Sequence, residues 1–100
     1  MKQFIYVLKL IERLTTESNW AAADNAAVAR HFEHLKALLA QGKLVLAGKT
    51  DGLDGKTFGL VIFEAEDLET ARRTMMADPA LVIGIMTADL YPYTIALIRS

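Results

Sequence analysis

Two segments of this chain resemble β-strands that carry apolar residues on both faces. In Phe4–Ile11, one face holds Phe4, Tyr6, Leu8 and Leu10, and the other holds Ile5 and Val7. Thr57–Phe63 repeats the pattern, with Phe58, Leu60 and Ile62 opposite Val61 and Phe63. A strand without a polar face is usually covered on both sides. We therefore expect a sheet with a packed layer against each face.

The composition indicates more apolar surface than one small domain can bury. The 100 residues suffice for one core, so we assign residues 1–100 to a single domain. Yet 53% of them are apolar, which is a high fraction for a chain of this size. Surplus apolar surface is commonly buried between subunits. We expect an oligomer that is at least a homodimer, with a larger assembly left open as an alternative.

Charge and residue usage exclude several classes of function. Eleven basic and 12 acidic side chains are mixed along the chain, with no basic stripe that would bind nucleic acid. The chain has no cysteine, which excludes disulfides, thiol catalysis and thiolate metal sites. The first apolar run is broken by Lys9, Glu12 and Arg13, and is too short for a signal or a membrane span. We expect a cytoplasmic protein without membrane or nucleic-acid partners.

The remaining elements follow from periodicity and capping residues. After a polar connection over 13–23, Asp24 is expected to cap a helix to about Gln41, where Gly42 ends it. Its apolar stripe would be Val28, Phe32, Leu35 and Leu39. A strand over Leu44–Ala47 and a Gly/Asp-rich hairpin loop over Gly48–Lys56 follow.

The second half repeats the strand–helix–strand order. Asp67 would cap a helix through Ala77, and Asp78-Pro79 would start a short turn. The last strand is expected over Ile85–Leu97, bent or interrupted at Pro92. Right-handed crossovers then give an α+β fold, a ferredoxin-like βαββαβ plait with both helices on one face of a four-stranded antiparallel sheet. Two copies packed through their bare sheet faces would form a dimeric α-β barrel.

His31 is the strongest candidate for chemistry, since an imidazole can exchange a proton near neutral pH. At ~100° per residue it lies about 70° from the centre of the expected stripe, and His34 about 130°. His31 is therefore expected at the boundary between core and solvent, and His34 near solvent. Asp78 follows the second helix, where its carboxylate could orient the imidazole as an acid/base dyad. Tyr6 and Arg30 are weaker candidates for binding a substrate anion.

Structural explanations remain open for each of these residues. His31 fits a packing role, Asp78 fits a helix cap, and the hairpin loop fits a solvated turn rather than a lip over a ligand. Trp20 fits packing over a helix end as well as the wall of a pocket. His31 and His34 could share a metal ion, but their spacing supplies no further ligand, so no metal site or cofactor is assigned.

The chain resembles the YCII-related (YciI-like) family of small dimeric α-β barrel proteins. The shared features are His31, the segment Gly42–Gly48, Gly59, the helix Asp67–Met76, and Ala77-Asp78-Pro79 with Gly84 shortly after. The family is regarded as enzymatic, with a His-Asp pair in a cleft, and related members include a dehydrochlorinase. The resemblance implies that His31 and Asp78 are that pair. In this chain Lys49 follows Gly48 where the family often has proline, and Arg30 directly precedes His31 where the family often has an arginine further upstream.

We therefore expect a lyase- or hydrolase-type enzyme acting on a small molecule by elimination, isomerisation or hydrolysis. His31 would be the general acid/base and Asp78 its orienting partner. The alternative is a non-catalytic module that binds a small ligand or serves in assembly on the same dimeric scaffold.

Overall fold

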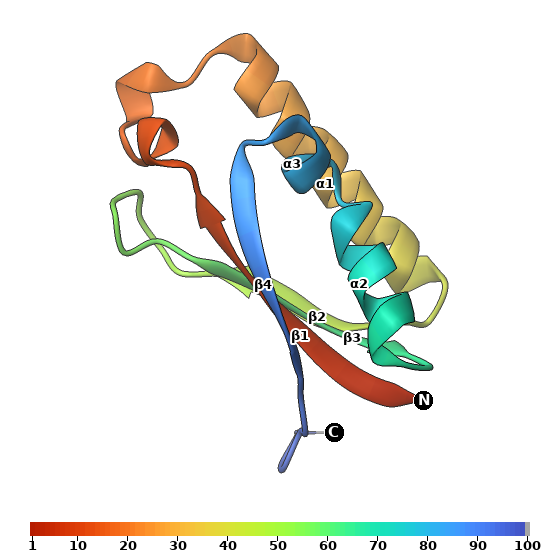
Figure 1. The fold of residues 1–100 in the computed structure, drawn as a ribbon. Helices are drawn as coiled ribbons and strands as arrows, with labels where there is room; N and C mark the ends of the chain where they lie inside the picture. Colours follow the sequence, from red (N-terminus) through yellow and green to blue (C-terminus); the bar gives the residue numbers. More distant parts are fainter. Residues whose placement is uncertain (100) are drawn as a thin grey trace.

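The computed structural model describes residues 1–99 and contains one antiparallel sheet with helices on one side. The strands are β1 (Lys2–Leu10), β2 (Leu44–Lys49), β3 (Gly59–Ala65) and β4 (Met86–Pro92), in the spatial order β2-β3-β1-β4. The helices are α1 (Ala22–Ala40), α2 (Leu68–Met76) and the short α3 (Pro79–Ile83). Figure 1 shows all three helices on the same side of the sheet. The predicted α+β, ferredoxin-like βαββαβ fold is confirmed.

The main core lies between the sheet and the helices. It combines alternate residues of β1 and β3 with residues of α1 and α2: Phe4, Tyr6, Leu8, Leu35, Leu38, Val61, Phe63, Ala65, Ala71 and Met75. A smaller cluster of Leu14, Ala27, Ala80 and Ile85 lies under two 3₁₀ turns, Glu12–Thr15 and Glu17–Asn19. These turns occupy the predicted polar connection between β1 and α1.

The caps of the two shorter helices agree with prediction. The Asp67 carboxylate accepts a hydrogen bond from the Thr70 amide at 2.8 Å, at the start of α2. Asp78 likewise accepts from the Ala80 amide at 3.0 Å, with Pro79 as the first residue of α3. Gly42, just past the end of α1, has φ +72°, a conformation that glycine adopts without a side-chain clash.

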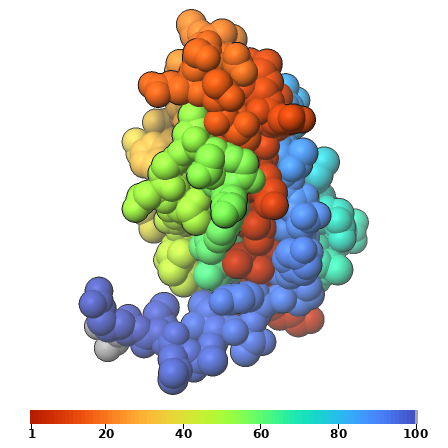
Figure 2. Space-filling model, turned by 90° about the vertical axis from the view of Figure 1, so that its left-hand side faces the viewer, coloured from red at the N-terminus to blue at the C-terminus, as the bar shows by residue number. Residues whose placement is uncertain are grey.

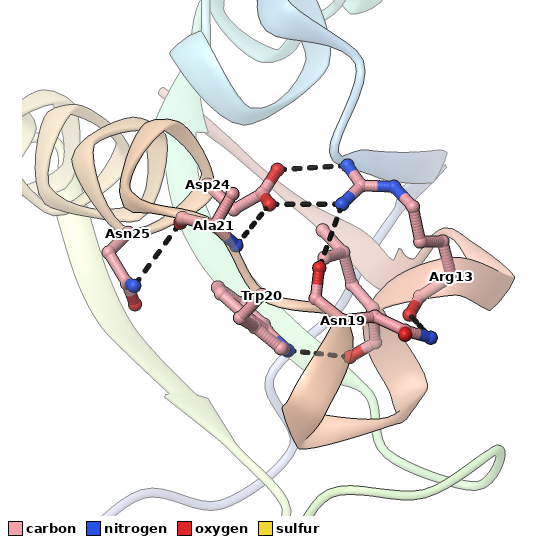
Figure 3. A network of polar contacts seen from close by, with 7 residues as sticks. Arg13, Asn19, Trp20, Ala21, Asp24 and Asn25 are labelled. Carbon is pink, nitrogen blue, oxygen red and sulfur yellow. Dashed lines mark hydrogen bonds and ion pairs between the residues drawn. The ribbon is translucent and has the colours of Figure 1, made fainter.

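The predicted start of α1 is wrong by three residues. The capping position is Ala21, and Asp24 is the third helical residue, from which its carboxylate reaches back to the Ala21 amide at 2.8 Å. Arg13 forms two parallel hydrogen bonds to the same carboxylate, at 2.9 and 3.0 Å (Figure 3). An acidic residue in the first turn of a helix satisfies a free amide as a cap does, so the residue type alone does not fix the boundary.

The predicted buried face of α1 is also wrong in part. Phe32 and Leu39 are 59% and 60% exposed, whereas Ala27, Leu35 and Leu38 are buried. The buried face therefore follows positions 24, 27, 31, 35 and 38, and His31 lies at its centre rather than at its edge. A small residue such as Ala27 lets the helix pack closely against its neighbours, so the buried face of α1 need not be the face with the largest apolar side chains.

The strand boundaries shift by one or two residues except at the last strand. β4 ends at Pro92 instead of reaching Leu97. Proline has no amide hydrogen to continue the sheet. One further backbone bond joins the Tyr93 amide to the Gln3 carbonyl at 3.0 Å.

The sheet face opposite the helices is not covered by any element of residues 1–99. Figure 2 views the molecule from this side, and the C-terminal segment extends away at the lower left. Ile5, Val7 and Leu60 are half-buried on this face and Ile62 is buried, whereas Lys9 and Asp89 are polar and exposed. The face thus has an apolar centre and a partly polar margin along β4. Of the helices described, none combines the length and apolar character needed to cross a bilayer.

Candidate functional site

The structure brings His31 and Asp78 into direct contact. His31 lies in the middle of α1, and Asp78 caps α3, which packs against α1. The Nδ1 atom of His31 is 2.7 Å from Oδ1 and 2.8 Å from Oδ2 of Asp78. The Asp78 side chain has no exposed surface, and the His31 side chain is 12% exposed. A carboxylate therefore holds the imidazole from its buried side.

Asp78 is surrounded by hydrogen-bond donors. The Tyr6 hydroxyl donates to Oδ2 at 2.8 Å, and the Ala80 amide donates to Oδ1 at 3.0 Å. Burial alone would raise the pKa of the Asp78 carboxyl, but the bonds from His31, Ala80 and Tyr6 outweigh it and hold that pKa below its ordinary value. Asp78 is accordingly a carboxylate near neutral pH.

This arrangement selects one form of the His31 ring. Since both oxygens of Asp78 accept hydrogen bonds, Nδ1 of His31 must be the donor in the contact between them. In the neutral imidazole the proton is then on Nδ1, and Nε2 carries the free lone pair. Within residues 1–99 no protein group bonds to Nε2, so it is available to accept a proton from a ligand.

His31 is part of the wall of an apolar pocket of about 290 Å³. The pocket lies between the helix-facing side of the sheet and α1, and the loop between β2 and β3 closes one end of it. Its apolar lining includes Leu8 and Leu10 of β1, Val28 and Phe32 of α1, Phe58 and Met86. Pockets that bind small ligands are usually of this kind, apolar with a few placed polar groups.

Trp20 and the β2–β3 loop both contribute to this pocket. Trp20 lines it, and its ring nitrogen donates to the Leu14 carbonyl at 2.9 Å, so packing and pocket formation occur together (Figure 3). Gly52, Leu53 and Thr57 bring the hairpin loop to the same cavity. The loop is thus a wall of the pocket as well as a turn.

Two other predicted site residues lie elsewhere. Tyr6 is fully buried in the core and reaches Asp78 instead of the pocket. Its pKa is raised well above the ordinary value by burial and by the neighbouring Asp78 charge. Arg30 is exposed on α1 and does not line the pocket.

His34 is more buried than predicted. It is half-buried, and its Nε2 atom is enclosed without a hydrogen-bond partner in the described chain. No cluster of three or more His, Cys, Asp or Glu side chains suited to a metal ion occurs within residues 1–99.

Sequence reasoning did not assign Lys49, Phe32 or Phe58 to the site, although all three line the pocket. The helical spacing places Phe32 in the apolar stripe of the first helix, and alternation places Phe58 on one face of the third strand. Lys49 lies two residues past Ala47, the end of the second predicted strand, so alternation with Ala47 is the one signal that could place it on the helix-facing side.

Comparisons with known proteins agree with this fold. Residues 7–91 match the model of the YCII-related domain. No curated protein sequence matches the chain significantly. Among solved structures, 5-chloro-2-hydroxyhydroquinone dehydrochlorinase (TftG) from Burkholderia phenoliruptrix AC1100, in complex with 2,5-dihydroxybenzoquinone, superposes with a TM-score of 0.69. The two chains share 20% identity over 92% of this chain and 93% of the other, which is a likeness of fold. Since the domain model spans most of the sequence, this chain belongs to the YCII-related family.

Proposed function

We propose that this protein is a small-molecule enzyme in which His31 takes and returns a proton and Asp78 orients its ring. The observation that carries the proposal is the contact of 2.7 Å between His31 Nδ1 and Asp78 Oδ1 at the wall of the apolar pocket. The buried carboxylate fixes the tautomer and stabilises the imidazolium formed when Nε2 accepts a proton. Tyr6 is a positioning residue that holds Asp78, because its hydroxyl reaches that carboxylate and not the pocket.

The reaction class is proton transfer at a small organic molecule, in an elimination, isomerisation or hydrolysis. In an elimination, Nε2 would take a proton from a substrate carbon, the C–H electron pair would form the new double bond, and the leaving group would depart. The dehydrochlorinase of the same fold carries out a reaction named for such a loss, which supports this class. In the pocket, few water molecules would compete with the substrate for the imidazole.

The experiment compares turnover with binding in matched variants. Chloride release from 5-chloro-2-hydroxyhydroquinone is the first assay, and solvent-deuterium incorporation into a panel of small carbonyl compounds, followed by NMR, is the second. We expect His31→Gln to lower turnover by about 10²–10⁴-fold, the usual contribution of a general acid or base, with little change in ligand affinity. His34→Gln, three residues along the same helix, is the control and should retain activity.

The outcome also separates the enzyme from the alternative, a binding or assembly module. A module would show no turnover with any compound, and His31→Gln would alter affinity alone. Equal turnover in wild type and His31→Gln would show that His31 takes no part in the reaction.

We further propose that the protein is a homodimer formed through the bare face of the sheet. The support is the apolar centre of that face, made of Ile5, Val7, Leu60 and Ile62, with no element of residues 1–99 above it. Two such faces related by a two-fold axis would bury each other. A larger assembly of these dimers and a cytoplasmic location stay predictions.

A further inference from the structure

We propose that the pocket selects a small organic anion, with an apolar body among the aromatic walls and its negative group at Lys49. Among residues 1–99, the lining contains two ionisable side chains, His31 and Lys49, and no acidic one. His31 is bonded to the Asp78 carboxylate behind the wall, so within residues 1–99 Lys49 is the one cation of the lining that no carboxylate offsets. Charge of one sign in a cleft with apolar walls raises the local concentration of ligands with the opposite charge.

Lys49 forms no ion pair with another side chain of residues 1–99. Its Nζ donates to the Thr50 carbonyl at 3.0 Å. A lysine keeps its ammonium group mobile at the end of a flexible apolar stem. The ammonium can exchange this one neutral acceptor for the anionic group of a ligand at small cost.

The neighbouring strand leaves space beside the lysine stem. Lys49 at the end of β2 pairs with Gly59 at the start of β3, and both line the pocket. A Cβ atom at Gly59 would lie 3.3 Å from the Gly48 carbonyl oxygen and 3.7 Å from the Lys49 Cβ. Glycine at this position therefore keeps the floor of the pocket open next to the lysine stem.

The size and walls of the pocket define the rest of the ligand. Its volume of about 290 Å³ is about twice that of a ~150 Å³ cavity that holds benzene. One ring with its substituents, or a branched chain of similar size, fits this space. Trp20, Phe32 and Phe58 offer aromatic surfaces to such a body. The class is thus a compact aryl or branched-chain anion, such as a carboxylate or an enolate.

The location of His31 in the same cavity links this ligand class to chemistry. An anion held at Lys49 leaves the opposite end of the ligand to approach His31. This last step rests on the proposed function, whereas the preference for an anion rests on the pocket alone.

The test uses Trp20, the only tryptophan of the chain, as a fluorescent reporter inside the pocket. The probes are 4-chlorobenzoate and 4-chlorobenzamide, which have nearly the same shape and differ in charge. At neutral pH and low salt we expect the carboxylate to bind about fivefold more tightly, the upper range for a partly exposed ion pair. Added salt should reduce that difference.

Variants then locate the source of the preference. Lys49→Gln should bind both probes equally. Lys56→Gln, in the adjoining loop between β2 and β3 but outside the pocket lining, should retain the wild-type ratio. Gly59→Ala should weaken both probes together. The proposal is overturned if neither probe binds, if wild type binds both equally, or if the preference survives Lys49→Gln.

A further variant distinguishes a failure of the anion-site proposal from a failure of the enzyme proposal. His31→Gln should retain the preference for the carboxylate. If His31→Gln removes the preference instead of Lys49→Gln, the assignment to Lys49 fails and the catalytic proposal is unaffected. If no compound is turned over but the preference depends on Lys49, the enzyme proposal fails and the anion site stands.

Discussion

A single buried carboxylate connects the local structure of this protein to its candidate chemistry. Asp78 caps α3, accepts the Tyr6 hydroxyl and holds the His31 ring, all without exposed surface. A buried charge is strongly unfavourable unless it is paired and hydrogen-bonded, and here three donors surround it. The cap explains why aspartate suits this position, and the contact with His31 adds a second reason that the local sequence does not reveal.

Replacement of the Tyr6 hydroxyl tests how far Asp78 depends on its neighbours. Tyr6→Phe retains the ring packed edge-on against Phe63 but removes one hydrogen bond to the carboxylate. We expect the free energy of unfolding at neutral pH to fall by about 1.5–3 kcal/mol, the range for a hydrogen bond to a charged group. In enzyme assays kcat should fall with little change in KM, because the hydroxyl acts through Asp78 and does not reach the pocket.

The effect of Tyr6→Phe should depend on pH with a definite sign. The bond from Tyr6 helps to hold the pKa of Asp78 below its ordinary value, so it stabilises the fold above that value and is lost as pH falls. Urea unfolding should thus show a large difference between variant and wild type at pH 7 and a smaller one in acid. Tyr93→Phe, on the exposed C-terminal segment, is the control and should match wild type at both pH values. An equal difference at all pH values would show that the hydroxyl does not support the charged carboxylate.

Among the elements, α1 shows how much of this site the sequence could predict. The helix, its glycine stop and the candidate His31 follow from local pattern, as do the caps Asp67 and Asp78. The rotation of α1 does not, because Phe32 and Leu39 form as good an apolar stripe as the smaller residues that are in fact buried. Contacts distant in sequence, from Asp24 to Arg13 and from His31 to Asp78, accompany the observed rotation. Three residues of the predicted stripe, Val28, Phe32 and Leu35, do line the pocket, but periodicity could not show that a cavity lies beside them.

The ion pair at the start of α1 predicts a second dependence on pH. Hydrogen bonds from Arg13 and from the Ala21 amide lower the pKa of Asp24 to about 2. A carboxyl with a lowered folded-state pKa stabilises the protein above its ordinary value of about 3.9 and loses that contribution as pH falls toward 2. Asp24→Asn should therefore be clearly less stable than wild type in urea at pH 7 and nearly equal to it near pH 2.

A surface pair provides the comparison for Asp24. Lys36 and Glu33 lie 3.4 Å apart on the exposed side of the same helix. Exposed pairs of this kind contribute little, so Glu33→Gln should change the stability slightly at any pH. If Asp24→Asn behaves like Glu33→Gln, the contact with Arg13 does not anchor the start of α1.

For the whole molecule, the decisive prediction is the homodimer. The outer margin of the bare sheet face includes Leu46 of β2, 45% exposed, and Tyr91 of β4, 51% exposed. A lysine at either position would place a charge inside a sheet-to-sheet interface, where no partner is available to compensate it. Leu46→Lys and Tyr91→Lys should therefore shift sedimentation from twice the chain mass toward the monomer at micromolar concentration. Val82→Lys is the matched control, since Val82 is 70% exposed on α3, on the opposite side of the sheet, and should leave the dimer intact. A wild-type protein that sediments as a monomer would mean that its apolar sheet face is simply exposed to water.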